Sequence, residues 1–320
     1  MLFSRQKISK MSAVVPSILG DISREQFLAE YWQKKPLLVR NAIADFEPPI
    51  DADELAGMAL EEEVESRIVI ERDWQLQCGP FTEETFAKLP ADKWTLLVQA
   101  VDLWVPEVAE ILSKFDFLPK WRMDDIMVSY AADGGSVGPH FDYYDVFLLQ
   151  GAGKRRWQIG AESNADCPFV PNTELKILQN FDPVDEWILE PGDMLYLPPK
   201  VAHHGVAIGE CTTFSVGFRA PAVSEMLDDL ATELLSGVAL PNHLVDPPLT
   251  PSMANQNISA AHLASVRKLL KDTLDNEKIL GEWFAQYMTM PKYPDLVGMT
   301  DETRRAVLED GTSFTNGEKD

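Results

Sequence analysis

Short apolar runs separated by turn residues dominate the middle of the chain, from about residue 124 to residue 218. The runs are rich in β-branched and aromatic residues, and Gly, Pro and Asp separate them, which is typical of antiparallel strands. The runs that we expect to form strands cover 126–130, 140–150, 154–159, 175–178, 187–189, 194–197 and 212–218. Many short strands joined by regular turns predict a sandwich or barrel of the jelly-roll or cupin kind.

The two flanks of this region have a different pattern. Before it, helices are expected at 23–32, 53–58, 82–86 and 105–115, and strands at 37–40, 66–70 and 94–101. After Pro221, apolar residues recur at helical spacing, first over 226–234 and then over 259–287. From Gly311 onward the residues are mostly small and polar, which predicts a disordered tail. The predicted fold class is therefore mainly β with α, with N-terminal α/β elements and a C-terminal helical segment.

The charge balance fits two interpretations: a basic partner, or an acidic surface that only keeps the protein in solution. The chain of 320 residues has 28 Lys and Arg against 51 Asp and Glu, a formal charge of -23. Such a surface repels nucleic acid and anionic lipid, so we expect neither as a partner. The three cysteines form no CxxC pair, and no apolar run is long enough for a membrane span. These features favour a cytoplasmic protein.

A candidate metal motif lies between two of the expected strands. His140 and Asp142 are two residues apart, so on a strand both would project from the same face. One more imidazole would complete a set of two His and one carboxylate, which binds iron(II) and leaves positions open for substrate and dioxygen. His203 and His204, after the Pro198-Pro199 stop, are the candidates. A solvated turn histidine and an Asp142–Arg pair are the simpler alternatives.

A candidate anion site follows from the alternation in 154–159. Arg155 shares a face with Trp157 and Ile159, and this apolar face should point into the barrel. A buried guanidinium requires a carboxylate, which a ligand acid such as 2-oxoglutarate would provide. Ser129, on the strand before the metal motif, could add a hydroxyl to that carboxylate, although an ordinary strand hydroxyl is the simpler interpretation.

Three residues after the metal motif are candidates for substrate contact: Tyr143, Tyr144 and Asp145. They are expected to line a groove, with Asp145 opposite a guanidinium of the substrate. Aromatic packing at the barrel rim is the alternative interpretation.

Several motifs together resemble a known family. They are Tyr31–Arg40 (YWQKKPLLVR), Gly138–Phe147 (GPHFDYYDVF), Gly153–Trp157 (GKRRW), Tyr196–Pro199 (YLPP) and Ser215–Pro221 (SVGFRAP). With them the chain resembles the JmjC-type ribosomal oxygenases over about residues 20–222, and most of all the bacterial ribosomal-protein arginine hydroxylases.

The resemblance implies a double-stranded β-helix fold, with Fe(II), 2-oxoglutarate and dioxygen as cofactor and co-substrates. It implies His140, Asp142 and His203 as iron ligands, because His203 holds the family's place after Tyr-Leu-Pro-Pro. It implies that Arg155 binds the distal carboxylate of 2-oxoglutarate, with Ser129 as a helper. The expected division is a catalytic domain over 1–222, a dimerisation region over 223–300 and a tail over 301–320, in which the family's winged-helix-like pattern is missing.

The implied reaction is hydroxylation of an arginine in a basic large-subunit ribosomal protein, the sixteenth, by a homodimer. Three alternatives stay open from sequence alone. One is a histidyl hydroxylase of a ribosomal protein, and another is a JmjC demethylase. The third is a cupin that binds ribosomal proteins without catalysing a reaction.

Overall fold

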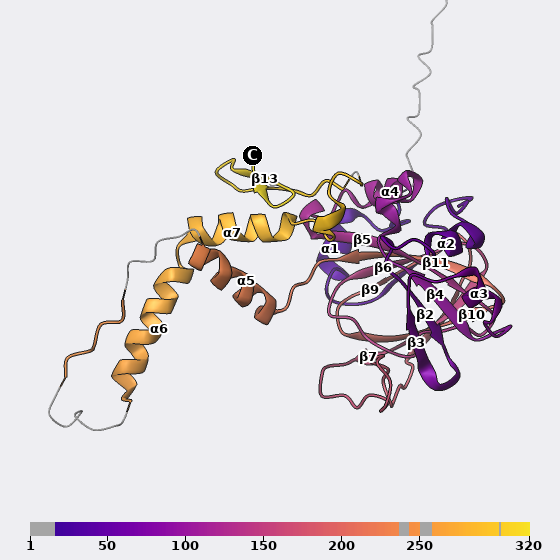
Figure 1. Ribbon diagram of the computed structural model, residues 1–320, viewed down its shortest axis with the longest axis horizontal. Coiled ribbons are helices and arrows are strands. Elements are labelled where there is room, and N and C mark those ends of the chain that lie inside the picture. The colour runs from indigo at the N-terminus through magenta and orange to yellow at the C-terminus, as the bar shows by residue number, and fades with distance from the viewer. Residues whose placement is uncertain (1–16, 237–242, 250–257, 301) are drawn as a thin grey trace, which may run out of the picture. The chain divides into compact units, whose positions relative to one another are not determined.

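The computed structural model describes residues 17–236, 243–249, 258–300 and 302–320. The chain divides into two compact units (Figure 1). Over its described residues, the first unit comprises Met1–Phe117 and Asp125–Gly217, and the second comprises Leu118–Asp124 and Phe218–Asp320.

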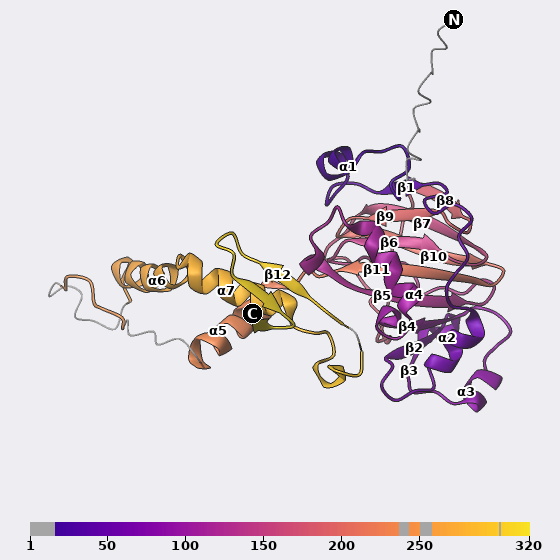
Figure 2. The ribbon, with the colours of Figure 1, turned by 90° about the horizontal axis from the view of Figure 1, so that it is seen from above.

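The first unit contains two antiparallel sheets. A large sheet has the strand order β1-β9-β6-β11-β5-β4-β2-β3, which can be followed in Figure 2, and a small sheet has the order β10-β7-β8. The strands are β1 (Leu37–Val39), β2 (Ser66–Ile70), β3 (Gln75–Cys78), β4 (Trp94–Val98), β5 (Met123–Ala131), β6 (Val146–Gln150), β7 (Lys154–Glu162), β8 (Asp185–Leu189), β9 (Met194–Leu197), β10 (Val201–Ile208) and β11 (Cys211–Phe218).

An apolar interior lies between the two sheets. The members of this cluster are Val146, Leu148, Trp157, Ile159, Leu189, Leu195 and Leu197, and each is less than 6% exposed. They come from β6, β7, β8 and β9, and those on β6, β7 and β9 occupy alternate positions, as the two-residue period of a strand requires. The predicted antiparallel barrel is therefore confirmed.

Aromatic side chains cover the other face of the large sheet. The ring of Phe147 on β6 lies 4.8 Å from Phe115 and 5.7 Å from Phe27, measured between centroids. Phe27 belongs to α1 (Arg24–Glu30), and Phe115 ends the turn after α4 (Pro106–Leu112). Burial of these rings attaches the helices to the outside of the barrel.

Polar side chains cap the start of three helices in the first unit. The Ser23 hydroxyl accepts from the Gln26 amide at 3.1 Å, and Asp51 forms a capping box at α2 (Ala52–Met58). Thr82 caps α3 (Glu83–Ala87) in the same way. Short 3-10 turns occupy Arg72–Trp74, Val101–Leu103, Ser113–Phe115 and Lys120–Arg122.

Several strand predictions were wrong. The expected strand over 140–150 begins only at Val146, and within 140–145 His140 makes just a single bridge to His203. Residues 175–178 form no strand, because Leu178 makes a single bridge to Phe169 and the segment is otherwise irregular. Conversely, 201–208 was not expected to be a strand but forms β10, the strand that pairs with most of β7. Its two histidines and a glycine lower its apparent β propensity, and pairing across the small sheet overrides that local preference.

The second unit is built from helices and a small sheet. Its elements are α5 (Val223–Ser236), α6 (Ala260–Leu274), α7 (Glu277–Thr289), a 3-10 turn (Pro294–Leu296), β12 (Arg305–Val307), β13 (Ser313–Thr315) and β14 (Glu318–Lys319). The predicted helix over 259–287 is divided in two, because Asn276 caps a new helix by accepting from the Ile279 amide at 3.2 Å. Within the described residues, no helix is long and apolar enough to span a membrane.

The tail from Gly311 is ordered, which corrects the prediction of disorder. Phe314 on β13 is only 2% exposed, and the chain then turns at Asn316 and Gly317, both with positive φ. Asn and Gly are the residues that adopt this conformation most readily, so the polar composition reflects a tight hairpin.

Candidate metal centre

The structure brings His140, Asp142 and His203 together. One ligand atom from each lies within 4.8 Å of the others. His140 and Asp142 lie in the segment between β5 and β6, while His203 belongs to β10. Their backbones pair directly, since the His140 amide donates to the His203 carbonyl at 3.0 Å and the His203 amide donates back at 2.8 Å. The segment that carries His140 and Asp142 is thus aligned with β10 by main-chain hydrogen bonds.

Both imidazoles have their Nδ1 atom engaged by a backbone carbonyl. Nδ1 of His140 lies 2.9 Å from the Gly138 carbonyl, and Nδ1 of His203 lies 2.9 Å from the Val201 carbonyl. A carbonyl only accepts, so each Nδ1 carries the hydrogen and each Nε2 keeps a lone pair for a metal. Nε2 of His203 lies 3.7 Å from Oδ2 of Asp142.

Loops support the metal motif on both sides. Gly138 has φ +81°, and a Cβ built there would lie 3.0 Å from the side chain of Ile177, so this position favours glycine. The Leu178 amide donates to the Pro139 carbonyl at 2.7 Å, and the Lys200 amide donates to the Asp142 carbonyl at 2.6 Å. The ligand-bearing segment is therefore fixed by its backbone as well as by its side chains.

The electrostatics keep His203 neutral. Burial, together with the neighbouring His140, lowers the pKa of His203 to about 4, although Asp142 acts in the opposite direction. A neutral imidazole at pH 7 is the form that binds a metal. His204 lies on the other face of β10, with its ring 6.0 Å from Phe181, and is not part of the group.

Arg155 projects from β7 into the interior, as the alternation predicts, and is 5% exposed. In the register with β10, Arg155 faces Ala207, Trp157 faces Gly205 and Ile159 faces His203. The Trp157 ring lies 5.6 Å from Cζ of Arg155 and 5.8 Å from the His203 ring, so it sits close to both. Nε and Nη2 of Arg155 have no hydrogen-bond partner among the described residues. A buried guanidinium whose Nε and Nη2 atoms make no hydrogen bond with a described residue fits an acidic ligand.

The comparisons with known proteins decide the family. A JmjC domain model matches residues 110–226, and an AraC-like ligand binding domain model matches residues 185–280. The probable ribosomal oxygenase of Haemophilus influenzae is 38% identical over 326 residues, covering 95% of this chain and 79% of the relative. The chain belongs to the JmjC-type ribosomal oxygenase family.

A further relative comes from Escherichia coli, known both by its sequence and by its solved structures under the name YcfD. The ribosomal protein uL16 3-hydroxylase is 36% identical over 269 residues, covering 83% of this chain and 71% of the relative. The structure of YcfD superposes with a TM-score of 0.84 at 32% identity, covering 94% of this chain and 86% of YcfD. A YcfD structure with cobalt and 2-oxoglutarate gives a TM-score of 0.82 over the same shares of the two chains. The fold is thus the JmjC cupin fold.

Ser129 lies on β5 and is 2% exposed. It shares a strand face with Ala131, and Ala131 contacts Ala207 and Cys211 in the interior. Two other interior residues were missed from sequence: Gln150 on β6 and Thr213 on β11. Both are buried polar residues at inward positions, and the alternation with Val146 and Leu148 could have revealed Gln150.

Tyr143 and Tyr144 are 49% and 42% exposed, and the Tyr143 ring packs edge-on against Phe141 at 5.4 Å. Asp145 was expected to line a substrate groove, but its side chain is fully buried. Its carboxylate accepts from the Tyr196 hydroxyl at 2.6 Å and from Nε2 of Gln33 at 3.1 Å. A carboxylate enclosed in this way cannot face a substrate guanidinium, and it instead ties the YWQKKP segment to β9.

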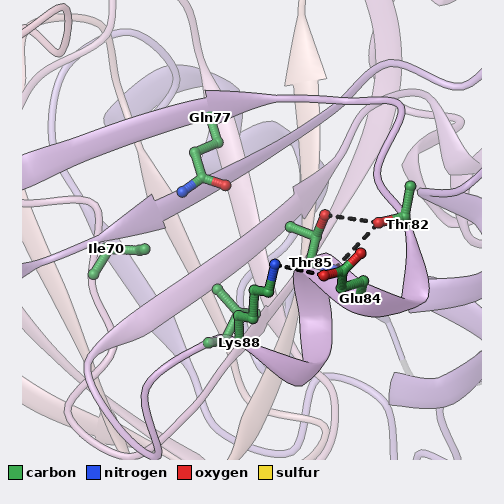
Figure 3. A pocket seen from close by; sticks show the side chains of 7 residues that line it. Ile70, Gln77, Thr82, Glu84, Thr85 and Lys88 are labelled. Carbon is green, nitrogen blue, oxygen red and sulfur yellow. Dashed lines mark hydrogen bonds and ion pairs between the residues drawn. The ribbon is translucent and has the colours of Figure 1, made fainter.

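A separate cavity of about 230 Å³ lies beside α3 (Figure 3). Its charged lining residues, Glu84 and Lys88, pair with each other at 2.6 Å, and both side chains are more than 70% exposed. These two charges satisfy each other in solvent, whereas Arg155 in the barrel is buried with nitrogen atoms that make no hydrogen bond. We therefore place the candidate functional site in the barrel and not in this cavity.

Proposed function

We propose that this chain is an iron(II)- and 2-oxoglutarate-dependent hydroxylase that modifies an arginine in a basic ribosomal protein. One observation carries the proposal. Two imidazoles with free Nε2 atoms converge with the Asp142 carboxylate, and an unpartnered Arg155 lies on the same interior face as His203. A metal and a dicarboxylic ligand together would satisfy both groups.

The residues present fit the implied metal. His140, Asp142 and His203 would hold iron(II) as two neutral imidazoles and one carboxylate, an arrangement that leaves positions open for ligands. When bound, iron with 2-oxoglutarate and dioxygen supplies the oxidising chemistry for inserting oxygen into a C–H bond. The chain contributes the orientation of each ligand atom through the Gly138 and Val201 carbonyls.

The interior fits 2-oxoglutarate. Arg155 would bind the distal carboxylate through its two free N–H groups, and Ser129 would add a hydroxyl. The apolar cluster around Trp157 and Ile159 excludes water from this space, which strengthens the ion pair. Arg155 therefore sets both the position and the direction of the co-substrate.

The substrate assignment rests on charge and on relatives. A chain with formal charge -23 attracts a basic protein, and the exposed Tyr143 and Tyr144 would contact it close to Asp142. The Escherichia coli relative is named for 3-hydroxylation of uL16, which favours the same protein here. A histidyl hydroxylase is the second candidate, because a relative of that name from Culex quinquefasciatus is 24% identical over 281 residues.

We also propose that the enzyme is a cytoplasmic homodimer. A ribosomal protein substrate is made in that compartment. Exposed leucines on α5 and α6, among them Leu235 at 89% and Leu270 at 61%, provide an apolar surface for a second copy of the chain.

Paired variants test the proposed function. We expect His203→Ala and Arg155→Ala to lower 2-oxoglutarate turnover by about 100-fold or more, since each removes a group that holds a reactant. The adjacent His204→Ala and Arg156→Ala remove the same side-chain types from the other face and should keep turnover within about threefold. Turnover that survives in the first pair would overturn the proposal.

The modified residue is identified by mass spectrometry. Ribosomal proteins incubated with the enzyme, 2-oxoglutarate and iron(II) should include one that gains a single oxygen atom. Peptide mapping then places this atom on arginine or on histidine. Oxygen on histidine would favour the second candidate, and loss of a methyl group with release of formaldehyde would indicate a demethylase.

A further inference from the structure

The Asp142 carboxylate is held differently from the two imidazoles of the metal centre. Each imidazole is oriented by a backbone carbonyl that lies 2.9 Å from its Nδ1 atom. Oδ2 of Asp142 lies 3.7 Å from Nε2 of His203, a distance too long for a hydrogen bond. The position of this carboxylate therefore depends on the backbone that carries it.

That backbone belongs to a segment outside the strands. Residues 140–145 lead from the bridge with β10 to the start of β6 at Val146. The Asp142 carbonyl accepts from the Lys200 amide at 2.6 Å, but the two residues after Asp142 are more than 40% exposed. The next anchor in the interior is Asp145.

Asp145 is fully buried and uses both of its carboxylate oxygens. Oδ1 accepts from the Tyr196 hydroxyl at 2.6 Å, and Oδ2 accepts from Nε2 of Gln33 at 3.1 Å. One partner comes from β9 and the other from the turn before β1. A buried carboxylate with two bonded oxygens is costly to displace, because its partners would lose their bonds as well.

Aromatic rings hold the Tyr196 side of this anchor. Tyr196 is 0% exposed, and its ring lies 4.8 Å from Phe147 and 5.0 Å from Phe27, measured between centroids. The Trp32 ring stacks on it at 5.8 Å. With the ring packed on several sides, the hydroxyl has a fixed place toward which Asp145 can be drawn.

Gln33 directs the hydroxyl hydrogen of Tyr196 toward Asp145. The Gln33 amide donates to the Tyr196 hydroxyl oxygen at 2.7 Å, so this oxygen accepts one bond and gives its own hydrogen to Asp145. Gln33 has φ +57°, a conformation that non-glycine residues keep only where their surroundings hold them. Its backbone and its side chain therefore serve the same carboxylate network.

We infer that Asp145 is a positioning residue of the metal centre, which fixes residues 142–145 through Tyr196 and Gln33 and thereby places the Asp142 carboxylate. The inference rests on the proposed function, and it gives the YWQKKP segment a part in metal binding. Asp145 acts only through the backbone of the third ligand. A ligand that is already fixed loses less conformational freedom when the metal binds, so the anchor raises metal affinity.

The test is equilibrium binding of manganese(II) to the metal-free full chain, measured by calorimetry without oxygen. Asp145→Ala removes both hydrogen bonds and should weaken manganese binding about tenfold or more. Tyr196→Phe removes one hydroxyl, keeps the ring in place and should weaken binding about fivefold. Asp145→Asn keeps an acceptor for Tyr196, and the Gln33 amide can turn to pair with it, so affinity should stay within about threefold of the wild type.

Asp193→Ala is the matched control. Asp193 is a buried acid at the turn before β9 and is 6% exposed. It accepts from Nη1 of Arg40 at 2.6 Å and from the Asn41 amide at 2.8 Å, away from the ligand-bearing segment. This variant should lose stability in urea denaturation but keep manganese affinity within about twofold. A merely structural role for Asp145 would give its variants the same behaviour.

The outcomes separate this inference from the proposed function. Wild-type protein that binds no manganese, or binding that His203→Ala leaves unchanged, overturns the proposed metal centre and this inference with it. Wild-type binding that both Asp145→Ala and Tyr196→Phe leave unchanged overturns only the role of Asp145.

A loss of affinity in Asp193→Ala equal to that in Asp145→Ala also overturns this role, because it would indicate a general effect on the fold. An Asp145→Asn protein as weak as Asp145→Ala would do the same, since its hydrogen bonds would then not be what holds the ligand. Should Asp145→Ala not fold, Tyr196→Phe decides by itself. Selective weakening with recovery in Asp145→Asn supports the inference.

Discussion

Gly205 on β10 determines how close the small sheet lies to the Trp157 ring. A Cβ built at this position would approach two ring carbons to 2.7 Å, a distance that real Cβ atoms essentially never show. The Trp157 ring lies beside both Arg155 and His203, so a shift of the ring would also shift these two side chains. Glycine is required here by space, since its φ is not in the left-handed region.

We expect Gly205→Ala to lower the free energy of unfolding by about 1–3 kcal/mol, because the added methyl group overpacks the interior. Urea denaturation followed by circular dichroism measures this change. Gly57→Ala is the control: Gly57 lies in α2 with nothing within 4 Å of its Cβ, and alanine there should stabilise by about 0.5–1 kcal/mol. If Gly205→Ala leaves the free energy of unfolding unchanged, the Trp157 ring can move aside at no energetic cost, which would contradict the prediction.

At the scale of elements, one carboxylate connects three segments of the second unit. Asp124 lies 2.9 Å from Nζ of Lys292, 3.3 Å from Nε of Arg219 and 3.5 Å from Nη2 of Arg304. Burial raises the pKa of Asp124, but the three cations outweigh burial and hold it below its usual value of 3.8. The ionised carboxylate therefore joins the start of β5 to the segments that follow β11 and α7.

This lowered pKa predicts an acid-sensitive contribution to stability. A group whose pKa is lower in the folded state stabilises the fold above its unfolded value and loses that effect as the pH falls through its folded value. We expect Asp124→Asn to cost about 1–3 kcal/mol at pH 7 and progressively less below about pH 4. Urea denaturation of the full chain between pH 7 and pH 3 measures the difference.

Asp272→Asn provides the comparison for this pH series. Asp272 pairs with Lys268 on an exposed face of α6, where ion pairs contribute little to stability. Its variant should follow the wild-type pH dependence throughout. A constant difference between Asp124→Asn and the wild type at every pH would contradict the role assigned to the ionised carboxylate.

At the scale of the whole molecule, the exposed leucines of α5 and α6 predict self-association. Leu235 and Leu270 should be buried in a dimer, so the wild type should sediment at twice the chain mass of 35.9 kDa. Leu235→Glu with Leu270→Glu would place charges in that interface and should shift the protein to monomer at micromolar concentration. Ile188→Glu, on the exposed face of β8 in the first unit, should leave the mass unchanged. A monomeric wild type would overturn the homodimer.

The sequence by itself determined what strand alternation controls. Arg155 was expected inside with Trp157 and Ile159, and the structure has it buried there. His140 and Asp142 do lie together, but in a segment outside the strands, so alternation does not account for them. Side-chain direction on a strand repeats every two residues and needs no knowledge of the partner strand. The family could also be assigned, because its motifs are local runs of residues.

Tertiary structure alone decided what depends on distant pairing. It paired 201–208 with β7 as β10, and it brought His203 to Asp142. It buried Asp145 against Tyr196, and it paired Thr213 on β11 with Gln150 on β6. These contacts join residues far apart in the chain, and the register between strands sets them. Register follows from the packing of the two sheets on one interior, which local patterns do not encode.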